Sequence, residues 1–283
     1  MARLEKLDFL ARKILSGELR GERRTPRRGS GTLFRDHKNY SQGDDLRFVD
    51  WNAYSRLGEL LVKQFESEEN LDLLLFLDAS GSMDWGTANK MDYARRIAAA
   101  LGFIGLRRHA KVELVPMPER RGEGRSRFFG SNRVLSYLEA LERVVAEGEV
   151  DLQEAVRAGV GRRRGRGLAV VLSDFMTESD YGRALQFLRH AGFRVAAVQV
   201  LDRQDLHPDI AGLVRLVDME SGRSLRRQVS RDLMARYESE VRGFCDGVAR
   251  FCRGNGVSYV RLDSSWTLER SIRALLLPGG LLT

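Results

Sequence analysis

The chain has 283 residues, of which 43% are hydrophobic and 30% charged, and its formal net charge is +8 at pH 7. This length is sufficient to bury a large hydrophobic core, and the composition excludes collagen-like and wholly disordered proteins. No apolar run approaches the roughly 18 residues of a membrane-spanning helix, so we expect a soluble, cytoplasmic protein.

The amino-terminal region is expected to be an appendage to the main domain. Leucine and isoleucine recur among charged residues from Met1 to Ser16, a pattern that predicts an amphipathic helix. This stretch has neither the uninterrupted apolar core nor the cleavage site of a signal peptide. A basic connector rich in glycine and proline follows from Gly17 to Gly31.

A segment dense in turn-forming, charged and aromatic residues follows the connector. It reads Tyr40-Ser-Gln-Gly43-Asp44-Asp45-Leu-Arg47-Phe-Val-Asp50-Trp51, and later Ser55-Arg56 and Val62-Lys-Gln-Phe-Glu66. The Gly43-Asp44-Asp45 cluster predicts a turn, and Arg47 is expected to pair with Asp44 or Asp50. Because an indole buries a large area, Trp51 is expected to anchor the segment against the rest of the protein.

A buried strand that ends in polar residues is the central feature of the sequence. The run Leu71-Asp-Leu-Leu-Leu-Phe-Leu77 is followed at once by Asp78-Ala-Ser80-Gly-Ser82. Short apolar runs of this kind are typical of parallel sheets, whose ligands bind beyond the carboxyl ends of the strands. Alternate positions can turn one carboxylate and two hydroxyls toward one point, and such oxygens suit Mg²⁺. Alternatively, the two serines cap the next helix while Asp78 holds the loop.

Helices and strands alternate through the rest of the chain. Helical spacing from Lys90 to Arg108 predicts a long helix whose amino end faces the polar loop. A hairpin of residues 111–115 and 126–130 predicts an antiparallel edge, and a helix is expected from residue 131 to about residue 147. Further elements are expected as a helix from about Ser179, a strand at 194–201, a hairpin at 213–229, a helix after Ser230, a strand at 257–262 and a helix at 266–277.

A second apolar run also ends in an acid. The sequence Gly167-Leu-Ala-Val-Val-Leu leads into Ser173-Asp174-Phe175. In a parallel sheet, this strand would deliver the Asp174 carboxylate to the same edge as Asp78. The alternative is that Asp174 caps the helix that begins near Ser179. The alternation of strands and helices from Leu71 onward predicts an α/β fold with helices on both faces of a doubly wound sheet.

Two resemblances support this interpretation. The Asp-x-Ser-x-Ser pattern of Asp78, Ser80 and Ser82 resembles the metal-ion-dependent adhesion site of von Willebrand factor A domains. The segment from Tyr40 to Glu66 and the Ser173-Asp174-Phe175 loop resemble the domain of unknown function 58 family, from roughly Gly31 to the end of the chain. This resemblance implies a von Willebrand factor A-like (Rossmann-type), mostly parallel sheet over residues 71–283 and an N-terminal extension over residues 1–70.

The resemblance also implies a cation site and a partner. Asp78, Ser80, Ser82 and Asp174 would hold Mg²⁺, or else Mn²⁺ or Ca²⁺, and a carboxylate of a protein partner would complete the shell. Val150 stands where the adhesion-site pattern has a threonine, and an aliphatic side chain cannot ligate Mg²⁺. Asp151 or Glu149 could substitute. Family members are often encoded beside MoxR-type AAA+ ATPases and are thought to act with them in assembling or activating other proteins.

The sequence motifs favour binding over catalysis. There is no Gly-x-Ser-x-Gly elbow, no Walker loop and no Gly-x-Gly-x-x-Gly after a strand, and none of the four histidines lies in a motif near the acidic loops. We therefore expect a non-catalytic protein-interaction module with a MoxR-type ATPase as partner. Two alternatives remain: a degenerate module that binds without metal, and a nucleic-acid-binding protein that uses the arginine clusters at residues 20–28, 120–127 and 162–166.

Overall fold

The computed structural model describes residues 33–42, 44–66, 72–119, 125–161, 167–177, 179–217 and 223–276. These residues fall into two compact units, one containing residues 33–66 and the other residues 72–276. The expected helix at 1–16 and the arginine clusters at 20–28 and 162–166 lie outside the described residues. Within the described ranges, no helix is both long and apolar enough to cross a membrane.

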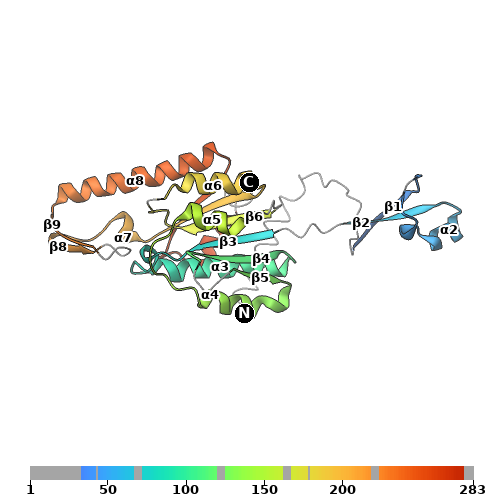
Figure 1. The fold of residues 1–283 in the computed structure, drawn as a ribbon, viewed down its shortest axis with the longest axis horizontal. Coiled ribbons are helices and arrows are strands. Elements are labelled where there is room, and N and C mark those ends of the chain that lie inside the picture. The colour runs from blue at the N-terminus through green and yellow to red at the C-terminus, as the bar shows by residue number, and fades with distance from the viewer. Residues whose placement is uncertain are drawn as a thin grey trace. The chain divides into compact units, whose positions relative to one another are not determined.

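The first unit is built on a two-stranded sheet (Figure 1). Strand β1 (Leu33–Asn39) pairs in antiparallel fashion with β2 (Leu61–Glu66), and the short helices η1 (Leu46–Phe48) and α2 (Trp51–Leu57) lie between them in the chain. Helix α2 begins after Asp50, whose side chain accepts hydrogen bonds from the N–H groups of Asn52 and Ala53. It ends at Gly58, whose φ of 71° is the left-handed conformation that glycine adopts readily.

The side chains of this unit pair differently from the sequence-based expectation. Arg47 pairs with Asp45, its Nη2 lying 2.6 Å from Oδ2, and not with Asp44 or Asp50. The reason is local: Asp45 caps η1 and already accepts the backbone N–H of Arg47. Within the first unit, Trp51 is 59% exposed and contacts Tyr54 edge to face; that it anchors this segment against the rest of the protein stays a prediction.

The second unit contains a six-stranded sheet in the order β10-β7-β6-β3-β4-β5. All neighbouring strands are parallel except β5, which pairs in antiparallel fashion with β4 at one edge. The chain passes from β3 to β4 on one side and then returns to β6 on the other, so β3 and β6 flank the topological switch point. The strands are β3 (Asp72–Asp78), β4 (Lys111–Met117), β5 (Ser126–Phe129), β6 (Gly167–Ser173), β7 (Arg194–Leu201) and β10 (Ser258–Asp263).

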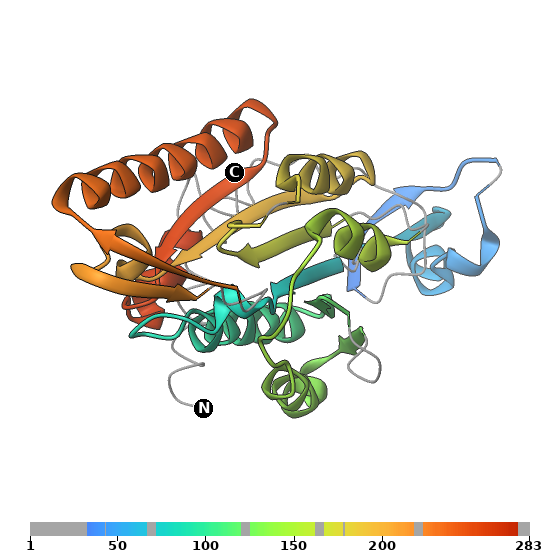
Figure 2. The same ribbon diagram turned by 60° about the vertical axis from the view of Figure 1, so that its left-hand side comes forward.

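Helices cover both faces of this sheet (Figure 2). Alternate residues of β3 enter two separate hydrophobic clusters: Leu75 and Leu77 pack with residues of α3, α4 and α9, whereas Leu74 and Phe76 pack with residues of α5, α6 and α8. The sheet is therefore buried on both faces, as its apolar sequences predict. The helices are α3 (Lys90–Arg107), α4 (Val134–Glu142), α5 (Leu152–Val160), α6 (Tyr181–His190), α7 (Arg203–Leu206), α8 (Arg231–Gly254) and α9 (Leu268–Leu276).

The predicted α/β fold class is confirmed: the sheet is mostly parallel and doubly wound, with helices on both faces. The expected hairpin near residues 213–229 is present as β8 (Gly212–Val217) and β9 (Ser224–Val229). Two details differ. Helix α4 ends at Glu142 rather than near residue 147, and the single-turn helix α7 was not expected.

Candidate functional site

The two acid-ended strands deliver their carboxylates to neighbouring positions. Asp78 is the last residue of β3, and Asp174 directly follows β6, the parallel neighbour of β3. Both residues are buried, with exposures of 1% for Asp78 and 2% for Asp174. They therefore lie at the switch point, beyond the carboxyl ends of the strands, where open α/β sheets bind their ligands.

The Asp78 carboxylate organises the loop that follows β3. Its Oδ1 accepts the backbone N–H of Ser80 at 2.9 Å, and its Oδ2 accepts the hydroxyl of Ser173. The hydroxyl oxygens of Ser80 and Ser82 lie 3.0 Å apart. Helix α3 is capped by Asn89, and Ser80 makes no side-chain cap on the short helix η2 (Gly81–Met83), so these serines do not cap a helix through their side chains. The other part of that alternative, in which Asp78 holds the loop, agrees with its hydrogen bond from Ser80.

The negative charge of Asp78 is costly in this position. Burial raises its pKa to about 6, and the neighbouring Asp174 carboxylate adds to the shift, while the hydrogen bonds from Ser173 and Ser80 oppose it. A charge that is both desolvated and near another acid favours any arrangement that brings a cation close.

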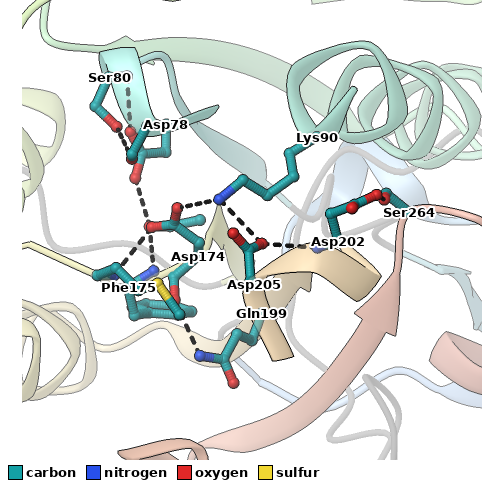
Figure 3. A network of polar contacts seen from close by, with 12 residues as sticks. Asp78, Ser80, Lys90, Asp174, Phe175, Gln199, Asp202, Asp205 and Ser264 are labelled. Carbon is teal, nitrogen blue, oxygen red and sulfur yellow. Dashed lines mark hydrogen bonds and ion pairs between the residues drawn. The ribbon is translucent and has the colours of Figure 1, made fainter. Parts of the chain in front are cut away.

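Asp174 has a partner that the sequence analysis missed. The Nζ of Lys90 lies 2.8 Å from Oδ2 of Asp174 and 3.2 Å from Oδ2 of Asp205, so these three residues form a lysine–aspartate triad (Figure 3). Lys90 is 2% exposed. Burial acts to lower its pKa, but the two carboxylates outweigh burial and the pKa of Lys90 is raised. Conversely, burial raises the pKa of Asp205, although Lys90 opposes that shift.

Two sequence signals could have pointed to this triad. Lys90 is the first residue of α3, where the helix dipole disfavours a cation, so a lysine there suggests a nearby acid. Asp202 and Asp205 have the spacing of a capping box, a sign of a helix start that would have located α7.

Other polar contacts hold the backbone around Asp174. Its Oδ1 accepts the N–H of Met176 at 2.9 Å, and its carbonyl oxygen accepts Nε2 of the buried Gln199 at 2.9 Å. Gln199 in turn accepts the hydroxyl of Tyr259 at 2.6 Å. Helix α6 is capped by Asp180 and not by Asp174, so the capping alternative for Asp174 was also wrong.

The loop before α5 lies against the Asp78 loop through backbone hydrogen bonds. The backbone N–H of Gly81 donates to the Gly148 carbonyl at 2.8 Å, and the N–H of Glu147 donates to the Ala79 carbonyl at 2.8 Å. Val150 is 5% exposed and belongs to the apolar cluster that includes Phe175. The Asp151 side chain caps α5, accepting the N–H groups of Gln153 and Glu154.

These contacts divide the expected metal ligands into two groups. Asp78, Ser80 and Ser82 bring hard oxygen atoms together in a manner that fits a small divalent ion. Asp174 instead faces an ammonium group, and Val150 has no ligand atom. In the part of the chain that the structure describes, no three His, Cys, Asp or Glu side chains gather as a conventional metal cluster.

Comparison with solved structures finds similarity at low sequence identity. It is similar to the conserved hypothetical protein BatB from Bacteroides thetaiotaomicron, with a TM-score of 0.45 and 16% identity over 73% of this chain and 95% of that one. It is also similar to the manganese-loaded Plasmodium vivax TRAP protein, with a TM-score of 0.36 and 15% identity over 73% of this chain and 72% of that one.

Sequence comparison identifies the family. The chain is 31% identical over 286 residues to the uncharacterized protein Rv1480 of Mycobacterium tuberculosis. The alignment covers 95% of this chain and 86% of that protein. The uncharacterized protein Mb1516 of Mycobacterium bovis matches with the same identity and coverage. Residues 36–243 match the family model described as protein of unknown function DUF58, and the chain therefore belongs to the DUF58 family.

Proposed function

We propose that this protein is a non-catalytic protein-interaction module of the cytoplasm that binds its partner at the switch point of the sheet. The docking site is the polar rim, which we define as Asp78, Ser80, Ser82 and Asp174. The observation that carries the proposal is that β3 and β6 are parallel neighbours and each ends in a buried carboxylate. Binding sites of open α/β sheets form at this position.

In the cation-dependent form of the proposal, Asp78, Ser80 and Ser82 would hold Mg²⁺. The 3.0 Å separation of the two serine hydroxyls and the raised pKa of Asp78 support a cation at these residues. A bound Mg²⁺ would supply positive charge to a carboxylate of the partner. Asp174, the fourth residue of the rim, would add a second carboxylate beside this group.

A metal-free form of the same function is favoured by a different observation. The ammonium of Lys90 already pairs with Asp174, and the buried Val150 stands at the position where the adhesion-site pattern has a threonine. In this form the partner would directly contact the loop backbone and Ser82, which is half-buried, whereas Ser80 is buried. The two forms share the docking site and differ only in their response to removal of divalent ions.

We propose a MoxR-type AAA+ ATPase as the partner, in the assembly or activation of other proteins. Membership of the DUF58 family supports this choice, since the resemblance to that family implies such a partner. The lack of hydrolase and nucleotide-binding motifs in the sequence supports a role without turnover.

The test is capture of a purified MoxR-type ATPase. Wild-type protein on a resin should retain the ATPase, and Asp78→Ala should reduce retention severalfold. Asp246→Ala, which removes an exposed acid on α8, is the matched control and should retain it fully. Loss of capture in EDTA would support the cation-dependent form, and unchanged capture would support the metal-free form. Full capture by Asp78→Ala would reject the rim as the docking site.

A further inference from the structure

The lysine–aspartate triad joins three segments that are far apart in the sequence. Lys90 begins α3, Asp174 follows β6 and Asp205 belongs to α7. All three residues are buried, with exposures of 2% for Lys90, 2% for Asp174 and 7% for Asp205. The triad therefore gathers one lysine and two aspartates in the interior, and it shares Asp174 with the polar rim (Figure 3).

An ammonium in this position needs compensation, because burial and the amino end of a helix both disfavour a cation. The structure provides it from two sides, at 2.8 Å from Asp174 and 3.2 Å from Asp205. Asp205 is held in place by the backbone N–H of Asp202, which donates to its Oδ2 at 2.8 Å. The acids are thus arranged around the ammonium and not around an empty centre.

The same contacts leave Asp174 poorly suited to a divalent ion. Its Oδ2 faces Lys90 and its Oδ1 accepts the N–H of Met176. An ion that approached this carboxylate would meet the repulsion of the nearby ammonium, and in a buried site such repulsion is weakly screened.

We infer that Lys90 is a tethered cation that takes the place of a metal ion's charge at Asp174 and thereby keeps the affinity of the polar rim for divalent ions low. This inference rests on the proposed rim and deepens it. Lys90 neutralises the second acid of the rim permanently, so that only Asp78 and the two serines remain available to an added ion. The charge balance of the docking site is then set largely by the chain itself.

The decisive experiment replaces the lysine while keeping the charge of the triad. Wild-type Lys90, Asp174 and Asp205 sum to one negative charge, and Lys90→Met combined with Asp205→Asn also leaves one negative charge, on Asp174. Mn²⁺ alone is the probe, and its dissociation constant is measured by calorimetry and by the shift in thermal midpoint. We expect the double variant to bind Mn²⁺ at least about tenfold more tightly than wild type, because the repulsive ammonium has gone.

Two control variants test whether a gain in Mn²⁺ affinity requires both the loss of Lys90 and the presence of Asp174. Asp205→Asn keeps Lys90 beside Asp174 and should bind Mn²⁺ no more tightly than wild type. Lys90→Met combined with Asp174→Asn also carries one negative charge, now on Asp205, and should show no gain. A double variant Lys90→Met/Asp205→Asn with wild-type or weaker affinity would overturn the inference.

If the Lys90→Met/Asp205→Asn variant does not fold, a second variant that keeps a hydrogen-bonding side chain at residue 90 replaces it in the test. Lys90→Gln with Asp205→Asn leaves an amide beside Asp174 and is judged by the same tenfold criterion. These measurements contain no partner protein. Their failure therefore removes the role of Lys90 while leaving ATPase capture intact, and failure of capture leaves the Mn²⁺ result standing.

Discussion

Asp202 and Asp205 hold each other at the start of α7. The backbone N–H of Asp202 donates to Oδ2 of Asp205 at 2.8 Å, and the Asp202 side chain accepts the backbone N–H of Asp205, so the two residues form a capping box. The Asp202 side chain also accepts the N–H of Gln204 at 2.9 Å. Oδ2 of Asp202 also accepts the hydroxyl of Ser264 at 2.8 Å and the N–H of Ala88 at 3.3 Å. Asp202 thus ties α7 to the segment before α3 and to the end of β10, and it orients the acid that faces Lys90.

Asp202→Asn should reduce stability in a pH-dependent manner. Burial acts to raise the pKa of Asp202, but hydrogen bonds from Gln204, Ser264 and Ala88 outweigh burial, and the pKa is lowered. A lowered pKa means that the carboxylate stabilises the fold above the pKa of the unfolded chain, near 4, and that this contribution is lost as pH falls through the folded-state pKa. We expect a cost of about 1–2 kcal/mol at pH 7 that shrinks at pH 3. Urea unfolding of wild type and variant at pH 7, 5 and 3 measures this stability cost. A cost that stays constant with pH would contradict the lowered pKa of Asp202.

Asp78→Asn should stabilise the protein in the absence of divalent ions. The pKa of Asp78 is raised to about 6, mainly by burial and then by Asp174, so at pH 7.5 the native state holds an unfavourable charge. An asparagine keeps the shape and one acceptor while removing that charge. The thermal midpoint in EDTA should therefore be equal to or above that of wild type, and any stabilisation by added Mn²⁺ should be lost. A large drop in midpoint would instead indicate that the two accepted hydrogen bonds dominate.

Gly102→Ala should be strongly destabilising. A Cβ atom at Gly102, on α3, would lie 2.2 Å from Cζ of Tyr137, a residue that is fully buried and donates its hydroxyl to the Ala98 carbonyl. Overpacking of this kind costs about 1–3 kcal/mol or more. The same substitution at Gly243 on α8, where a Cβ meets nothing within 4 Å, should stabilise by about 0.5–1 kcal/mol. Chemical denaturation of both variants measures the contrast, and similar effects at the two positions would argue against the packing of α3 on α4.

Val150→Thr should increase affinity for Mn²⁺ while reducing stability. The substitution places a hydroxyl where the adhesion-site pattern has one, but Val150 is 5% exposed within an apolar cluster, so burial of the hydroxyl costs about 1–3 kcal/mol. Val156→Thr, at a 0% exposed position of the same cluster, is the control. It should lose stability without any gain in Mn²⁺ affinity. Calorimetry would count against a ligand position at residue 150 if both variants bound the ion alike.

The sheet could be predicted from sequence because its strands have a simple pattern. Leu74 to Leu77 and Ala169 to Leu172 are uninterrupted apolar runs, and only strands covered on both faces combine that composition with such short length. Each apolar run ends at a polar residue, Asp78 or Ser173, and this change predicts where each strand ends and its polar loop begins. The adjacency of the two carboxylates then follows from parallel pairing.

The pairing of side chains could not be predicted in the same way. Lys90 and Asp174 are 84 residues apart, and which acid faces the lysine depends on how α3 and α7 pack on the sheet. Periodicity identifies the buried face of a helix but not the individual contact that its first residue makes. The exposure of Trp51 has a similar origin, because hydrophobicity alone does not fix whether an aromatic residue is buried.

The backbone hydrogen bonds between the Asp78 loop and the loop before α5 have a consequence for binding kinetics. Because hydrogen bonds join Gly81 to Gly148 and Glu147 to Ala79, the backbone at the proposed docking site is held in place before any encounter. Little conformational entropy remains to be lost on this side of the interface, so the penalty for ordering falls on the incoming protein. Differences among partners would accordingly be expressed in how long each complex lasts rather than in how fast it forms.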